Sequence, residues 1–129
     1  MNRFGAATPI LRIWDETRAR EFYIDFLGFT VEFEHRFEPG TPLYMGIRKG
    51  DCRIHLSEHS GDGSPNARVR IETDDVIAFQ QQLLAKKYKY ARPGVHDQEW
   101  GAREMCISDP FDNRIIFYSS TSSPSLPSK

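Results

Sequence analysis

A hairpin pattern occurs twice in this chain, about 61 residues apart, and this repetition constrains the fold more than any other feature. In the later copy, two apolar-rich runs at 102–108 and 114–119 flank the sequence Asp-Pro-Phe-Asp-Asn. Proline pre-sets one backbone angle of a turn, and Asp and Asn tolerate left-handed geometry, so we predict a β-hairpin. In the earlier copy, runs at 43–48 and 53–57 flank a Lys-Gly-Asp turn. Two copies of one supersecondary unit are therefore expected.

The segments before each hairpin also follow one order. In the first half, alternation predicts a strand at 6–13, Asp15 is a candidate helix N-cap, and Gly28 ends the apolar helical pattern before a strand at 29–37. In the second half, the same signals predict a strand at 67–73, a helix capped by Asp74 or Asp75 and reaching about residue 87, a short strand at 88–92, and a loop at 93–101. Both halves thus read β-α-β-β-β, which is an α+β fold.

A length of 129 residues fits one domain, which we place at 1–119, with repeat one at about 6–59 and repeat two at about 67–119. The Ser- and Pro-rich segment 120–129 is expected to be a disordered tail. A net charge of −1 argues against a nucleic-acid partner, and no apolar run reaches the length of a membrane span. Cys52 and Cys106 lack metal-ligand spacing, which suggests free thiols and a cytoplasmic location.

Several motifs match a known family in content and order. They are Trp14-Asp15 before Phe22-Tyr23, Leu27-Gly28-Phe29, His55-Leu56-Ser57-Glu58-His59, Glu99-Trp100-Gly101 and Asp109-Pro110-Phe111-Asp112-Asn113-Arg114. Together they resemble the glyoxalase/bleomycin resistance/dioxygenase superfamily, also called vicinal oxygen chelate, and the bleomycin resistance branch in particular. The resemblance implies two βαβββ repeats in which each sheet curls into a cup, with the helix on the convex side and the binding site on the concave side.

Enzymes of that superfamily hold a divalent metal with a His or Glu from the first and last strand of each repeat. The matching positions in this chain are Thr8, His55, Arg68 and Ile116. Of these four side chains, only the imidazole of His55 is a usual metal ligand, and the guanidinium group of Arg68 would repel a cation. We therefore expect no metal and no cofactor.

The resemblance instead implies a homodimer that sequesters bleomycin-type glycopeptide antibiotics without chemistry, in grooves between subunits that are lined by aromatic rings. Pro9 stands where such proteins exchange their first strand between subunits, and proline's missing N–H suits that place. Trp100 lies in a polar loop where no periodic face requires it, so we expect it to stack on a planar ligand. The expected ligand-binding residues are Trp100, Phe37, Phe33, Tyr44, Arg12, His55, Arg68 and Ile116.

Two alternatives stay open. The predicted concave faces carry arginines at 12, 53, 68, 70 and 114, and unless nearby glutamates pair with them, these favour an unknown anionic metabolite over a cationic drug. The second alternative is a metal-dependent glyoxalase- or dioxygenase-type enzyme with a shifted site around His55, Glu58 and Glu104. Metal titration separates that enzyme from a binding protein.

Overall fold

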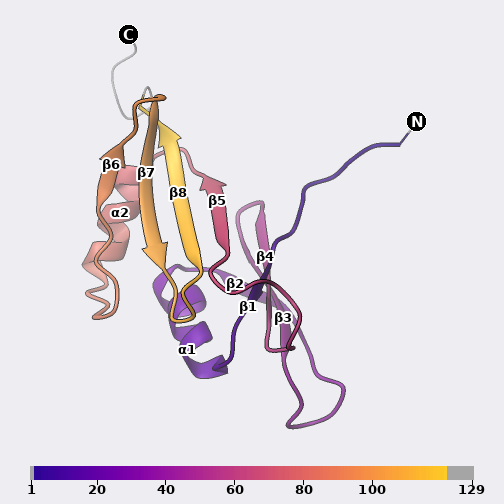
Figure 1. Ribbon diagram of the computed structural model, residues 1–129. Helices are drawn as coiled ribbons and strands as arrows, with labels where there is room; N and C mark the ends of the chain where they lie inside the picture. Colours follow the sequence, from indigo (N-terminus) through magenta and orange to yellow (C-terminus); the bar gives the residue numbers. More distant parts are fainter. Residues whose placement is uncertain (1, 122–129) are drawn as a thin grey trace.

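Two four-stranded sheets form the framework of the protein, one from each half of the chain (Figure 1). The structure is a computed structural model that describes residues 2–121. The first sheet has the order β1-β4-β3-β2 and the second has the order β5-β8-β7-β6. In each sheet the first and last strands of the repeat pair in parallel, and the remaining pairs are antiparallel. The predicted α+β class with two βαβββ repeats is confirmed.

The elements of the two repeats correspond one to one. The first repeat contains β1 (Ile10–Arg12), α1 (Glu16–Arg20) continued by a π-helical segment (Glu21–Phe26), β2 (Thr30–His35), β3 (Tyr44–Lys49) and β4 (Cys52–Ser57). The second contains β5 (Arg68–Glu72), α2 (Val76–Ala85), β6 (Val95–Asp97), β7 (Ala102–Ser108) and β8 (Arg114–Ser120). Ser120, the first residue of the predicted tail, thus belongs to a strand, and residues 122–129 of that predicted tail lie outside the described part of the chain.

Both helices begin at an aspartate whose side chain binds the first turn. Asp15 Oδ1 accepts from the backbone N–H of Arg18 at 3.1 Å, and Asp75 Oδ1 accepts from that of Ala78 at 3.1 Å. These bonds satisfy backbone donors that have no partner within the helix. At the other end of the first helix, Gly28 adopts a φ of 87°, a left-handed conformation that suits glycine. The sequence-based helix starts are confirmed, with Asp75 as the cap of the second helix.

Two predicted strands are wrong in extent or place. The first strand was expected at 6–13 but comprises only Ile10–Arg12, and the residues before Pro9 form an exposed arm. The strand predicted at 88–92 is absent, and β6 lies instead at Val95–Asp97, inside the predicted loop. Tyr88, in the predicted strand, instead packs against the core, where its ring centroid lies 4.6 Å from that of Phe26.

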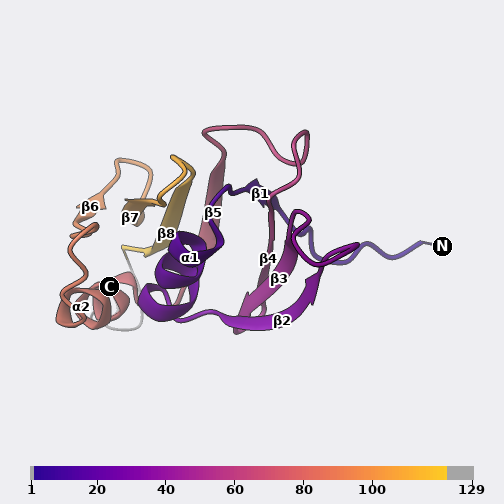
Figure 2. The ribbon, with the colours of Figure 1, turned by 90° about the horizontal axis from the view of Figure 1, so that it is seen from below.

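The helices cover one face of the sheets and leave the other face open. In β4, Ile54 and Leu56 are fully buried, whereas Arg53 and His55, which alternate with them, point to the opposite face. Figure 2 shows α1 against the first sheet, with the N-terminal arm on the sheet's other side. Within residues 2–121, neither helix has the length and apolar character needed to cross a membrane.

Candidate functional site

Three rings gather on the open face of the first sheet. The ring of Phe33 on β2 stacks on that of Tyr44 on β3, with the ring centroids 6.2 Å apart. It is also T-shaped to the imidazole of His55 on β4, with the centroids 5.2 Å apart. The Tyr44 hydroxyl lies 2.8 Å from His55 Nδ1, within hydrogen-bond distance. Burial raises the pKa of Tyr44, and the charge of Asp62 raises it further. A polar link therefore fixes two of the rings while the third remains 41% exposed.

Gly46 makes this arrangement possible. It pairs with Phe33 across the β2–β3 ladder, and a Cβ added at Gly46 would meet the Phe33 ring at 2.1 Å. A side chain at this position would therefore prevent the ring from lying flat over the strand. The β2–β3 register shifts between Val31 and Phe33, which places Phe33 opposite Gly46.

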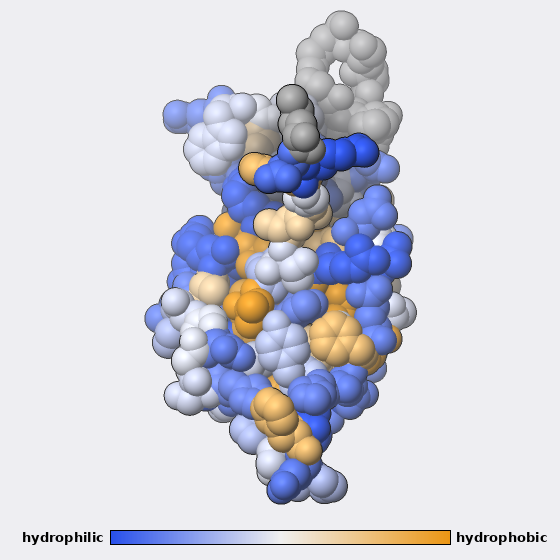
Figure 3. Space-filling view, turned by 90° about the vertical axis from the view of Figure 1, so that its right-hand side faces the viewer, coloured by the Kyte–Doolittle hydropathy of each residue, from blue (hydrophilic) through white to orange (hydrophobic). Residues whose placement is uncertain are grey.

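Further rings extend this surface toward the β2–β3 loop. Phe37 is 78% exposed, and its ring meets the edges of His35 at 5.1 Å and His59 at 6.3 Å. We call the six residues Phe33, His35, Phe37, Tyr44, His55 and His59 the aromatic face. Figure 3 shows the side of the molecule that carries the N-terminal arm, where apolar patches are interspersed with hydrophilic side chains. Such a mixture suits a planar ligand with polar substituents.

The arginines of the open faces are only partly paired. Arg53 Nε donates to Glu32 at 3.1 Å and Arg70 donates to Glu104 at 2.8 Å. Arg12 donates to the backbone oxygen of His59 at 3.0 Å. The guanidinium groups of Arg68 and Arg114 have no hydrogen bond or ion pair with any residue in the range 2–121. On the open faces, a carboxylate therefore pairs with Arg53 and with Arg70, whereas the two arginines whose guanidinium groups have no partner belong to the second sheet.

Three of the predicted ligand-binding residues, Trp100, Arg68 and Ile116, do not lie at the aromatic face of the same chain. Trp100 is 69% exposed in the turn between β6 and β7, and Figures 1 and 2 both place this turn far from the β2–β3 loop that carries Phe37. Ile116 lies on β8 beside Arg70 and is only 4% exposed. Arg68 also belongs to the second sheet. A single chain thus brings together Phe33, Phe37, Tyr44 and His55, with Arg12 bonded to His59, but not the whole predicted set.

The positions corresponding to the metal ligands do not fit a divalent ion. Thr8 lies in the arm, outside the sheet, and Arg68 and Ile116 supply a cation and an alkyl group. His55 has its Nδ1 engaged by Tyr44. Across residues 2–121, no three His, Cys, Asp or Glu side chains converge in a way that could hold a metal.

The alternative shifted enzyme site is not assembled within one chain either. Glu58 accepts from the backbone N–H of Leu43 at 2.9 Å, at the end of the first sheet. Glu104 lies in the second sheet, bound to Arg70, whereas His55 lies in the first. The three groups therefore do not surround a common point.

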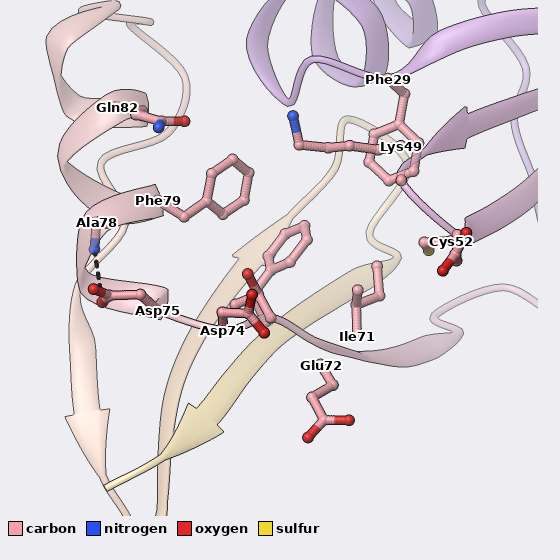
Figure 4. A pocket seen from close by; sticks show the side chains of 14 residues that line it. Phe29, Lys49, Cys52, Ile71, Glu72, Asp74, Asp75, Ala78, Phe79 and Gln82 are labelled. Carbon is pink, nitrogen blue, oxygen red and sulfur yellow. Dashed lines mark hydrogen bonds between the residues drawn. The ribbon is translucent and has the colours of Figure 1, made fainter. Parts of the chain in front are cut away.

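A cavity between the repeats was not anticipated from the sequence. It has a volume of about 620 Å³ and lies between the β3–β4 turn and the start of α2 (Figure 4). The Lys49 ammonium reaches across it to the ring of Phe79, 5.4 Å from the centroid, and Cys52 borders it, where burial raises the pKa of the thiol. Because its walls come from distant segments, no local sequence pattern marks it. It is separate from the aromatic face.

Two βαβββ units, each with one helix-covered and one open sheet face, define a protein of the vicinal oxygen chelate class. The chain belongs to the glyoxalase superfamily, because the model of that family, described as glyoxalase superfamily protein, matches residues 2–123.

Its relatives include proteins named for an antibiotic. The bleomycin resistance proteins of Geobacillus stearothermophilus and Staphylococcus aureus are each 28% identical to it, over 85% of this chain and 92% of theirs. A bleomycin-binding protein from bleomycin-producing Streptomyces verticillus, solved with copper(II)-bleomycin, is 28% identical with a TM-score of 0.68, over 91% of this chain and 97% of that one. A bleomycin-binding protein complexed with bleomycin is 25% identical with a TM-score of 0.65, over 91% of this chain and 99% of that one.

Proposed function

We propose that this protein binds a bleomycin-type antibiotic and sequesters it in the cytoplasm without converting it. The observation that carries the proposal is the cluster of Phe33, Tyr44 and His55 within the aromatic face, which we call the platform. It offers aromatic surface on which a planar heteroaromatic group can stack. Offset stacking on such rings contributes roughly 0.5–1.5 kcal/mol beyond area burial. The relatives named for bleomycin resistance and bleomycin binding support the same ligand.

The charge distribution is compatible with a cationic guest at this platform. Glu32 accepts from Arg53 at 3.1 Å and lies 3.7 Å from Arg48, so both guanidinium groups near the platform have a carboxylate. Arg68 and Arg114, whose guanidinium groups have no partner within residues 2–121, lie on the second sheet. The ion pairs of Glu32 reduce the repulsion between the first sheet and a cationic ligand.

The proposed working form is a homodimer. The β6–β7 turn, which carries Trp100, and the β2–β3 loop, which carries Phe37, lie far apart in a single chain. If both rings stack on one ligand, a second copy of the chain must supply one of them. Phe4 in the N-terminal arm is 94% exposed, and residues 2–8 make no hydrogen bond with the rest of the described chain. An arm that leaves the body at Pro9 is suited to pack on a partner, because an apolar residue in solvent gains free energy on burial.

Fluorescence tests this proposal, because the sequence has only two tryptophans. In a Trp14→Phe variant, Trp100 is the sole indole, and we expect metal-free bleomycin to quench its emission in a saturable way. In the matched Trp100→Phe variant, the indole of Trp14 packs edge-on against Phe111 at 5.0 Å and is expected to respond little. An unchanged Trp100 signal, together with no saturation in equilibrium dialysis, would contradict the proposal.

A further inference from the structure

Two arginines stand side by side at one edge of the second sheet. Arg68 begins β5, Arg114 begins β8, and the two are direct partners in the parallel ladder. Ser108, the last residue of β7, is in turn the partner of Arg114. The strands β5, β8 and β7 are neighbours in the second sheet (Figure 1). The three residues are direct ladder partners, so they form one row across three strands, and all three are exposed on the same face.

The row borders a hollow of about 250 Å³. Its lining is Asn66, Arg68, Ser108, Asp112 and Arg114. Asn66 and Asp112 adopt φ values of 62° and 65°, in the turns that precede β5 and β8. The hollow therefore combines two cationic groups, a hydroxyl and an amide with one carboxylate, on a sheet different from that of the aromatic face.

These two arginines differ from every other arginine in the strands. The guanidinium group of each of the others donates to an acceptor. Arg12 and Arg48 donate to the backbone oxygens of His59 and Gly50, respectively. Arg53, Arg70 and Arg103 donate to the carboxylates of Glu32, Glu104 and Asp97, respectively. The guanidinium groups of Arg68 and Arg114 have no acceptor among residues 2–121, and Asp112 forms an ion pair with neither. Like charges directly opposite each other in a sheet are destabilising, so the free protein carries a cost that a bound anion would remove.

We propose that Arg68 and Arg114 bind the carboxylate or phosphate group of a small molecule, with Ser108 as an additional donor. Guanidinium groups present paired N–H donors that match the oxygens of these anions, and charge-assisted bonds are about twice as strong as neutral ones. Asp112 opposes the anion, yet two positive charges against one negative leave a net attraction. Within one chain this site lies on the second sheet, apart from the aromatic face on the first.

The test uses inorganic phosphate and acetate as separate probes, at constant ionic strength set with chloride, because screening alone changes charged surfaces. NMR of the arginine Nε–H groups in the full chain reports binding at each guanidinium. We expect saturable shifts at Arg68 and Arg114 with at least one probe, and whichever probe saturates identifies the anion class. No saturable shift with either probe would overturn the proposal.

Variants distinguish a specific site from general charge. Arg68→Gln and Arg114→Gln should each weaken anion binding by about tenfold or more, whereas Arg53→Gln on the other sheet should leave it unchanged. Asp112→Asn should strengthen binding several-fold by removing the opposing charge. Without anion, Arg68→Gln should also raise the melting temperature, because it relieves repulsion. Retained binding in the Arg68→Gln/Arg114→Gln double variant, or weaker binding in Asp112→Asn, would contradict the site.

Discussion

The hydroxyl of Tyr23 donates a hydrogen bond to Oδ2 of Asp109 over 2.5 Å, joining the helix of the first repeat to the hairpin turn of the second. Both side chains are buried. Asp109 Oδ1 also accepts from the backbone N–H groups of Phe111 and Asn113, at 2.8 Å each. The Asn113 amide in turn donates to the backbone oxygen of Arg12 at 3.1 Å. This network fixes the two repeats relative to each other.

Removing one donor from that network should lower stability. Tyr23→Phe keeps the ring but leaves Asp109 with one donor fewer, and a hydrogen bond to a charged group contributes about 1.5–3 kcal/mol. We expect the free energy of unfolding, measured with urea, to fall by about 2 kcal/mol. Tyr90→Phe is the matched control, since Tyr90 is exposed and its hydroxyl has no hydrogen bond within residues 2–121. Equal stability of the two variants would show that the bond is unimportant.

Alkaline pH should destabilise the protein through Tyr88. Burial, followed by its bond to Glu21, raises the pKa of Tyr88 to about 12, against about 10 in an unfolded chain. The folded state therefore holds this proton more tightly, so the contribution is complete below about pH 10 and is lost as the pH rises through about 12. In urea titrations across this range, the Tyr88→Phe variant should lose stability less steeply than the wild type. Parallel curves would contradict this assignment.

Turn and cap residues made most of the fold readable from the sequence. Asp15 and Asp75 cap their helices because short acceptors satisfy the first-turn N–H groups. The turn between β7 and β8 has Asp112 at a φ of 65°, the left-handed geometry expected for such a residue. These signals depend only on neighbouring residues, so they can be recognised in the sequence without knowledge of the tertiary structure.

What the sequence could not predict depends on contacts between distant segments. The fit of Phe33 over Gly46 needs the bulge in β2, and the pairing of Arg53 with Glu32 needs the resulting register. The alternation of Tyr88 and Tyr90 is typical of a strand, but no strand forms there. The ring of Tyr88 instead packs on that of Phe26, 62 residues earlier in the sequence, and a local pattern does not indicate so distant a contact.

Filling the space under Phe33 should affect binding more than stability. In Gly46→Ala the new methyl group displaces the Phe33 ring from its neighbours Tyr44 and His55, and because this ring is partly exposed it can turn into solvent. We expect bleomycin affinity to fall by about tenfold while the free energy of unfolding changes by less than about 1 kcal/mol. Gly94→Ala, whose added Cβ meets nothing closer than His96 at 3.7 Å, is the control. Unchanged bleomycin affinity in Gly46→Ala would show that the position of the Phe33 ring does not contribute to binding.

Removal of the N-terminal arm should dissociate the proposed dimer. A chain lacking residues 2–8 retains β1, and it loses only a segment that makes no hydrogen bond with the rest of the described chain. Sedimentation velocity is expected to give a dimer for the full chain and a larger monomer fraction for the shortened one. A monomeric full chain would contradict the dimer, and an unchanged dimer after truncation would contradict the role of the arm.

The proposed function requires the rings of the first sheet to hold the planar group of the antibiotic. Isothermal titration of the full chain with metal-free bleomycin, repeated with Phe33→Ala, measures this contribution. We expect saturable binding of about one molecule per chain, weakened by about tenfold or more in the variant, because a stacking partner is lost. The absence of saturable heat with the full chain, or identical affinities for both proteins, would contradict it.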